Sequence, residues 1–353
     1  MNAALLDPSC PVEPFSLDLP WAAWQRLKLR LGRERRNDEA WDAALQYGVP
    51  LPTLTTLLDR WRDALDWAEV NAALGELPWF RRRAAGSTLC FLHERCSSAS
   101  APTLLLLHGS FGSPLEFRAL WTELIRSFHV VCPALPGFGV SSSDFAPSLR
   151  SVAEQLSGLM AALGYERYAV HGSELGGQIA AQLARSAPEQ VTRLHVVELR
   201  ALPEPDADDL ATLSPADKSR LAALTLLEHT AVHAAPRSCT ELLACALARL
   251  DAVDDALPAF SDELLLGLSL RWLGGDAAFA TALADAARAP RWSRSETPTC
   301  VCSFPLAGPS LRGVAERHQR IEAWLEHDRG GAMPALEQPR LLLRSLLEFC
   351  PAP

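Results

Sequence analysis

The chain has 353 residues, of which 48% are hydrophobic, so it is long enough to bury a large core in one large or two modest domains. Its net charge of −9 at pH 7 argues against nucleic acid or an anionic membrane as a partner. It contains no run of about 18 apolar residues and no basic-then-apolar leader, so we expect a soluble, cytoplasmic protein without a membrane segment.

The first region, residues 1–85, is predicted to be a helical extension rich in tryptophan and arginine. One helix opens at Leu19-Pro20-Trp21, and a second is predicted from Pro52 to Trp67. The amphipathic pattern of these helices places their tryptophans in the core or on a docking surface.

The second region, residues 86–202, alternates strands with helices. Leu104 to Leu107, Val130 to Cys132 and Ala169-Val170 are short, continuous apolar runs, which are typical of buried parallel strands. Their alternation with helical segments predicts an α/β fold with a mostly parallel, doubly wound sheet.

Residues 203–290 are rich in Ala, Leu and Asp and are predicted to be a helical cap inserted after the sixth strand, over the carboxyl ends of the strands. The core resumes over residues 291–353, with a strand from Thr299 to Phe304 and a closing helix from Pro339 to Phe349. The nine cysteines lack a Cys-x-x-Cys pair and are expected to be small buried hydrophobic residues in a reducing compartment, without a metal site.

The sequence around Glu174 has the pattern of a nucleophile elbow, the strained turn that presents a reactive side chain between a strand and a helix. Such a turn needs small residues two positions before and two after the reactive residue, because backbone packs against backbone there. Gly172 and Gly176 meet this need for Glu174. Ser173 does not fit the role, because the residues two positions before and two after it, His171 and Leu175, are too large for the turn. A glycine-rich turn without chemistry stays an alternative.

Several further motifs occur in a fixed order along the chain. They are Pro14-Phe15, Trp61-Arg62-Asp63, Phe91-Leu92-His93, the loop His108-Gly109-Ser110-Phe111-Gly112-Ser113 followed by Glu116-Phe117, the stretch Cys132-Pro133-Ala134-Leu135-Pro136-Gly137-Phe138-Gly139, and the stretch from Arg329 to Glu337. In these motifs the chain resembles the microsomal-type epoxide hydrolases of the α/β-hydrolase superfamily. The resemblance implies an α/β-hydrolase fold with a helical cap, the helical N-terminal extension of that family, and an oxyanion loop. The residues that it assigns to the oxyanion and elbow loops are His108, Gly109, Ser110, Phe111, Ser173 and Leu175.

The catalytic residues that the resemblance implies are mostly absent. In that family an elbow aspartate attacks the epoxide, and a histidine supported by an acid activates water to hydrolyse the resulting ester. By position these residues are Glu174, Ala332 and Ala307, and an alanine cannot transfer a proton. The proline of the oxyanion loop is replaced by Phe111, and all three tyrosines precede the cap, so no cap tyrosine pair can hold an epoxide oxygen. Ordinary covalent epoxide hydrolysis is therefore not expected.

The candidate catalytic residue is Glu174, acting as a proton donor or acceptor, with a structural acceptor for loop amides as the alternative. Glu198 ends a strand, where a solvated carboxylate is the favoured interpretation, and His171 is more consistent with a core histidine than with a base. His229 and His233 share a helical face of the cap and either look into the pocket or are partly exposed, without a third metal ligand. The candidate pocket residues are His171, Glu198, His229, His233, Ala307, Ala332 and Met333.

A lidded pocket with few charges suits a bulky hydrophobic or aromatic ligand. The resemblance extends to proteins of this fold with altered triads, which tailor natural products. We therefore expect a non-hydrolytic tailoring enzyme for a polyketide-type small molecule of secondary metabolism, acting by epoxide opening or ring formation, or by cofactor-independent oxygenation with molecular oxygen. The alternatives are a catalytically inactive ligand-binding protein and an unconventional epoxide hydrolase. No cofactor and no metal are expected, and the chain is expected to be a monomer or a homodimer.

Overall fold

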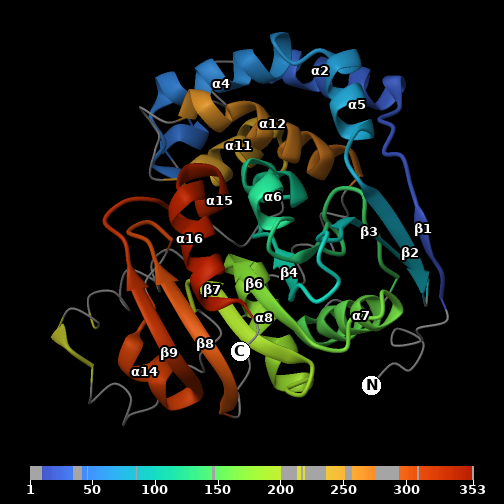
Figure 1. Ribbon diagram of the computed structural model, residues 1–353. Helices are drawn as coiled ribbons and strands as arrows, with labels where there is room; N and C mark the ends of the chain where they lie inside the picture. Colours follow the sequence, from blue (N-terminus) through green and yellow to red (C-terminus); the bar gives the residue numbers. More distant parts are fainter. Residues whose placement is uncertain are drawn as a thin grey trace.

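A computed structural model describes the fold around one large sheet (Figure 1). The described residues are 10–34, 42–45, 47–84, 86–144, 148–199, 213–215, 218, 236–250, 257–274, 294–307 and 310–351. The described strands are β1 (Val12–Pro14), β2 (Trp79–Ala84), β3 (Ser87–Glu94), β4 (Thr103–Leu107), β5 (His129–Pro133), β6 (Tyr168–Ser173), β7 (Val191–Val197), β8 (Ser295–Ser303) and β9 (Gln319–Glu326).

These strands form one sheet in the order β1-β2-β3-β5-β4-β6-β7-β8-β9. The pairs among β1, β2, β3 and β5 are antiparallel, and the pairs from β5 through β4, β6, β7 and β8 to β9 are parallel. The central strands are continuous apolar runs because helices cover both of their faces. The chain thus has the α/β-hydrolase fold with a mostly parallel sheet, as predicted.

The described helices are α2 (Trp21–Arg33), α4 (Leu51–Asp63), α5 (Trp67–Gly75), the 3-10 helix η1 (Pro114–Phe117), α6 (Arg118–Leu124), α7 (Leu149–Ala162), α8 (Glu174–Ser186), α11 (Cys239–Leu247), α12 (Leu257–Gly274), α14 (Arg312–His318), α15 (Pro334–Glu337) and α16 (Pro339–Phe349). Helices α7, α8 and α14 pack on one face of the sheet, where Leu156, Ile179 and Ala315 share a buried cluster. Helices α6 and α16 lie on the other face, within a second buried cluster. That cluster continues into α11 and α12 and the N-terminal helices, which lie above them in Figure 1.

The N-terminal range differs in two ways from its prediction. It is largely helical, but it also contributes strands β1 and β2 to the sheet. The helix predicted from Pro52 to Trp67 is two helices, because the Asp66 side chain accepts hydrogen bonds from the backbone N–H groups of Ala68 and Glu69 and so begins α5. Since β1 is an additional strand, the insertion predicted after the sixth strand follows β7 instead.

Other expectations from the sequence agree with the structure. Trp61 is fully buried, and its indole N–H donates a hydrogen bond to Ser269 Oγ over 2.8 Å, which joins the N-terminal extension to α12. All nine cysteines are free thiols and eight are buried, whereas Cys10 is partly exposed. Within the described ranges, no helix has both the length and the apolar character needed to cross a membrane.

The turn between β6 and α8 has the close backbone packing that the glycine pattern predicts. A Cβ atom on Gly172 would lie 2.3 Å from the carbonyl oxygen of Gly176, and one on Gly176 would lie 2.5 Å from the carbonyl oxygen of His108. Such contacts involve backbone atoms, which cannot move aside as a flexible side chain can. The glycines therefore bring the start of α8 directly against the end of β4.

We expect Gly176→Ala to destabilise the fold by about 3 kcal/mol or more, because a methyl group would overlap two backbone carbonyls. Gly32→Ala in α2 is the matched control, since nothing lies within 4 Å of its added Cβ, and it should stabilise the protein by about 0.5–1 kcal/mol. Urea unfolding measures both changes. Equal stabilities of the two variants would contradict the packing argument.

Candidate active site

The elbow holds Glu174 in a backbone conformation that glycine normally adopts. Its φ angle is +45°, and it is the first residue of α8, directly after β6. This left-handed conformation costs a non-glycine residue about 1–2 kcal/mol, and such strain is concentrated at functional sites. Glu174 is 4% exposed, so the turn delivers its carboxyl group into the protein interior.

Both carboxylate oxygens of Glu174 have protein partners. Arg249 Nη1 lies 2.9 Å from Oε1, and both side chains of this ion pair are largely buried. The backbone N–H of Ser110, in the predicted oxyanion loop, donates a hydrogen bond to Oε2 over 3.2 Å. Each contact stabilises negative charge on the carboxylate. The sequence predicts a pocket with few charges, and the structure adds to Glu174 a cap arginine that pairs with it.

Arg249 also contacts the loop in which the resemblance places the general base. Its carbonyl oxygen accepts a hydrogen bond from the backbone N–H of Ala332 over 2.8 Å. A Cβ atom on Gly331 would lie 2.2 Å from the same oxygen, so the loop needs glycine at this approach. Ala332, Met333 and Ala307 are fully buried. The side chain that reaches the elbow from this side is thus a guanidinium, which cannot accept a proton.

A second carboxyl group, that of Glu116, lies beside the elbow on η1. Burial, and after it the negative charge of Glu174, raise the pKa of Glu116 to about 8, against a smaller lowering by the backbone of Ser113. Its Oε2 atom is buried and has no hydrogen-bond partner among the described residues. A Cβ atom on Gly112 would lie 2.0 Å from that oxygen, so the loop fits closely around the carboxyl group. At neutral pH Glu116 is therefore a neutral acid next to a carboxylate.

His108 orients the oxyanion loop and is fully buried. The backbone N–H of Leu135 donates to Nε2 over 3.0 Å, so the ring proton is on Nδ1, which donates to the carbonyl oxygen of Gly109 over 2.8 Å. Burial lowers the pKa of His108 to about 4. Its imidazole is therefore neutral at physiological pH and occupied at both nitrogens.

A second cap arginine, Arg271 on α12, lies near the same carboxylate. Its guanidinium lies over the rings of Phe111, at 5.2 Å, and Phe138, at 4.8 Å from their centroids. Burial lowers the pKa of Arg271 to about 10, and the charge of Glu174 is among the contributions that oppose this change. The group stays protonated at neutral pH, so among the described residues both Arg249 and Arg271 place a guanidinium near Glu174.

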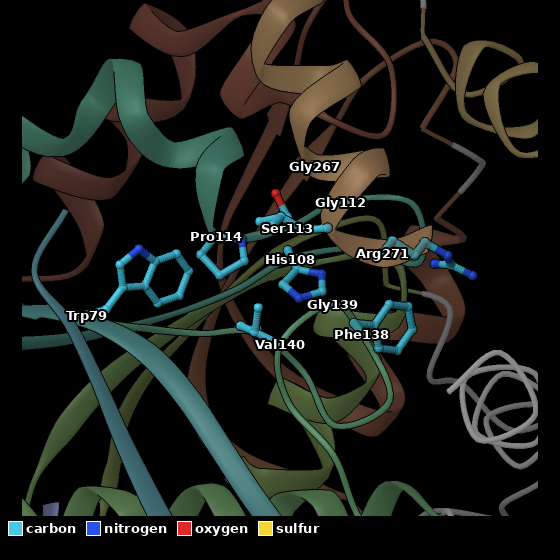
Figure 2. Close-up of a pocket in the computed structure, with 12 residues that line it drawn as sticks. Trp79, His108, Gly112, Ser113, Pro114, Phe138, Gly139, Val140, Gly267 and Arg271 are labelled. Carbon is cyan, nitrogen blue, oxygen red and sulfur yellow. The ribbon is translucent and has the colours of Figure 1, made fainter. Parts of the chain in front are cut away.

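A cavity adjoins this group of charges (Figure 2). It is partly open to solvent, and about 250 Å³ of space free of protein atoms lies along its lining, open solvent included. Trp79 lies at one end of its lining in Figure 2, and Arg271 and Phe138 lie at the other. The remaining lining residues are His108, Gly112, Ser113, Pro114, Ala134, Gly139, Val140, Gly267 and Leu270. The lining is mainly apolar and aromatic with one charged side chain, which suits an apolar ligand that carries one polar group.

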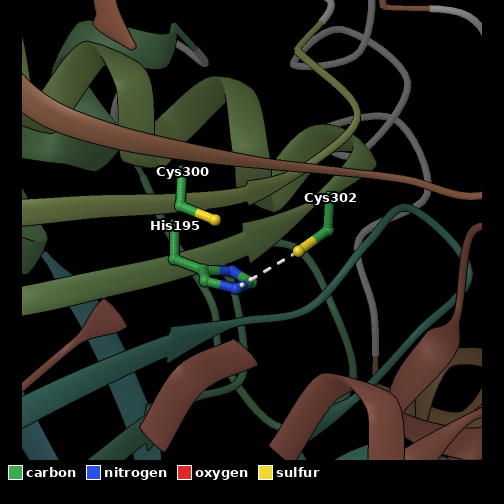
Figure 3. A group of neighbouring side chains, drawn as sticks. All are labelled: His195, Cys300 and Cys302. Atoms are coloured by element: carbon green, nitrogen blue, oxygen red, sulfur yellow. Dashed lines mark hydrogen bonds between the residues drawn. The ribbon is translucent and has the colours of Figure 1, made fainter. Parts of the chain in front are cut away.

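His171 lies on strand β6 within the sheet, where it contacts His195. It is fully buried, and its Nδ1 lies 3.0 Å from Nδ1 of His195. Burial and the neighbouring His195 hold the pKa of His171 well below its usual value. His195, Cys300 and Cys302 bring their nitrogen and sulfur atoms within 4.8 Å of one another, and Figure 3 shows the contact between His195 and Cys302.

The remaining predicted site residues are either buried near the elbow or lie outside the described residues. Glu198 is 1% exposed and has a φ angle of +65°, so the favoured interpretation of a solvated carboxylate is wrong. Burial follows from the packed turn after β7, because the carbonyl oxygen of Glu198 lies near Gly177 of α8. Ser173 and Leu175 are buried on either side of the elbow. His229 and His233 lie outside the described residues.

The sequence analysis does not identify Arg249 or Arg271 as site residues, and it assigns no role to Glu116. Each arginine is the single cation within an apolar stretch of the cap, and that isolation is a usable sequence signal because buried cations are rare without a partner. Glu116 was noted only as part of a motif. The charge of Glu174 raises the pKa of Glu116, and this proximity is apparent only in the folded structure, where the loop lies over the elbow.

Comparisons with known proteins agree with this architecture. Residues 12–117 match the family described as the epoxide hydrolase N terminus, which extends beyond the boundary predicted at residue 85. Residues 102–255 match the alpha/beta hydrolase fold family. A protein of Stigmatella aurantiaca that is provisionally named an epoxide hydrolase is 30% identical over 96% of this chain and 84% of its own length.

Two further relatives come from insects. Juvenile hormone epoxide hydrolase 1 of Ctenocephalides felis is 26% identical over 52% of this chain, and the match spans 42% of that enzyme's own length. The crystal structure of juvenile hormone epoxide hydrolase from the silkworm Bombyx mori superposes with a TM-score of 0.78 at 21% identity, covering 96% of this chain and 94% of that one. At this identity the structural likeness concerns the fold.

The buried ion pair gives a first prediction for the site. Arg249→Met should destabilise the protein by about 3–5 kcal/mol, because it leaves the Glu174 carboxylate buried without its cation. Adding Glu174→Gln should restore part of the loss, and urea unfolding measures both variants. Arg60→Met, which breaks an exposed pair with Asp262, is the control and should cost less than about 1 kcal/mol. Equal losses for Arg249→Met and Arg60→Met would disprove the pairing.

The raised pKa of Glu116 gives a second prediction. A folded-state value of about 8 exceeds the ordinary 4.5, so the protein should lose stability as pH rises from about 4.5 to about 8. Glu116→Gln removes this loss and should be more stable than the parent at pH 8 by on the order of 2 kcal/mol. Glu123→Gln on the surface is the control. Parallel stability curves for the parent and Glu116→Gln across this range would refute the assignment.

Proposed function

The chain belongs to the epoxide hydrolase family of α/β-hydrolase fold proteins, and we propose that it opens an epoxide in a bulky apolar or aromatic small molecule without forming an ester on the protein. The observation that supports the proposal is the buried pair of Glu174 and Arg249 at the elbow. The reaction that fits this site is an isomerisation, in which a hydroxyl group of the substrate itself attacks the epoxide and closes a ring. Such ring closure is a typical step in tailoring a polyketide-type natural product.

The contacts of Glu174 disfavour attack by its carboxylate. One oxygen faces a guanidinium and the other accepts a backbone hydrogen bond, so both are stabilised as a resting anion. An ester formed there would also persist, since Ala332 and Ala307 cannot activate water. Loss of a member of a catalytic triad generally costs several orders of magnitude in rate. The elbow is better suited to holding a proton acceptor than to presenting a nucleophile.

Two carboxyl groups in different protonation states can catalyse the ring closure. The hydroxyl oxygen of the substrate forms a bond to an epoxide carbon while the carbon–oxygen bond of the epoxide breaks. The neutral Glu116 donates its proton to the departing oxygen, and the Glu174 carboxylate accepts the proton of the attacking hydroxyl. Transfer of that proton from Glu174 back to Glu116 restores the starting state, so no water, oxidant or cofactor is consumed.

A second candidate function is binding of the same ligand without catalysis. The observation that favours it is that both oxygens of Glu174 already have protein partners. Cofactor-independent oxygenation is the third outcome that the experiment must separate. It would need a carbanion-forming substrate and dioxygen in place of an epoxide.

The test is to incubate the purified protein with an aryl epoxide that carries an internal hydroxyl group, in ¹⁸O-labelled water. We expect a product of unchanged mass, without ¹⁸O and without an adduct on Glu174 in the intact-protein mass spectrum. Glu116→Gln should lower the rate at least about 100-fold, since general acid catalysis contributes that much, whereas Glu123→Gln should not. A diol containing ¹⁸O, oxygen consumption, or ligand binding without turnover would each overturn the proposal.

A further inference from the structure

Helix α12 packs against the oxyanion loop and the loop after β5 through residues on one of its faces. Gly267, Leu270, Arg271 and Gly274 are spaced by three, four and seven residues, so they share that face. A Cβ atom on Gly267 would lie 2.7 Å from Ser113 Oγ, and one on Gly274 would lie 2.3 Å from the carbonyl oxygen of Gly139. The two glycines therefore let the helix approach both loops closely and fix Arg271 at the cavity.

The guanidinium of Arg271 lacks a full set of partners at this position. Its Nη1 atom is buried, and no hydrogen-bond partner for it exists within the described part of the chain. Phe111 and Phe138 contact its charge with their rings, which stabilises a cation but gives Nη1 no hydrogen-bond acceptor. A buried N–H donor without an acceptor costs about 1–3 kcal/mol, so this group is set up to bind an acceptor from outside the protein.

Glu174 does not supply that acceptor. Its two oxygens are engaged by Arg249 and by the backbone of Ser110. Arg249 is itself paired with that carboxylate, so the buried Nη1 of Arg271 is the guanidinium nitrogen that an acceptor on a ligand can satisfy.

We propose that the cavity between Trp79 and Arg271 binds the carboxylate of an apolar or aromatic acid, with Arg271 as the receptor for that carboxylate. A planar guanidinium matches a carboxylate with two parallel hydrogen bonds, and the apolar walls of the cavity accommodate the rest of the ligand. The inference rests on the proposed function only in taking this cavity as the ligand site. It narrows the substrate class from bulky apolar molecules to those that carry an acidic group.

The test compares benzoate with benzyl alcohol, which has the same ring but no charge, by isothermal titration calorimetry at pH 7. Benzoate should bind at least about tenfold more tightly than the alcohol. Arg271→Met should reduce benzoate affinity to that of the alcohol, whereas Arg271→Lys should keep part of it. Arg60→Met, which removes an exposed arginine of the extension, should change neither affinity. Equal binding of the two probes, or unchanged benzoate binding by Arg271→Met, would overturn the proposal.

A second measurement remains informative if Arg271→Met does not fold. The titratable groups near Glu116 include Glu174 from α8, Cys132 from β5 and His108 from the oxyanion loop. Burial raises the pKa of the Cys132 thiol and lowers that of His108, so both are neutral at pH 7. Ionisation of Glu116 should therefore weaken benzoate binding by the parent between pH 7 and pH 9. Glu116→Gln should abolish this weakening, and an unchanged pH profile would count against the charge assignment. Because binding needs no turnover, failure of either binding test is distinguishable from failure of the ring-closure test.

Discussion

The ion pair between Glu174 and Arg249 is the interaction on which the candidate site depends. It joins three parts of the chain, because Arg249 comes from the cap, Glu174 from the elbow, and the carbonyl oxygen of Arg249 is bonded to Ala332 near the C-terminus. Two charges withdrawn from water are stable only when each satisfies the other. The pair therefore fixes the cap segment against the core.

Burial then determines the state of each remaining ionisable group. Glu116 is buried and lies near the carboxylate of Glu174, so it stays protonated at neutral pH. His108 is buried between two backbone groups and stays neutral, whereas Arg271 keeps its charge because even a lowered pKa of about 10 is far above neutrality. The roles that we propose, with Glu116 as proton donor, Glu174 as proton acceptor and Arg271 as anion-binding group, depend on these surroundings.

The sequence predicted the features that depend on neighbours along the chain. The elbow was identified from Gly172 and Gly176 because the close approach that requires glycine is encoded within five residues. Contacts between distant segments were not accessible in this way. Nothing in the vicinity of Glu174 indicates that Arg249 will reach it, and the burial of Glu198 depends on how the turn after β7 packs on α8. The cap histidines His229 and His233 remain predictions.

The packing of α12 through Gly267 and Gly274 constrains how the cap of this family can vary. An α-helix turns by about 100° per residue, so inserting one residue between Gly267 and Arg271 would rotate the guanidinium away from Phe111 and Phe138. The spacing between Gly267 and Arg271 in the sequence is consequently as informative about the ligand site as the arginine itself. Homologues that share the arginine but shift its spacing would present a different side chain to the cavity and would select different ligands.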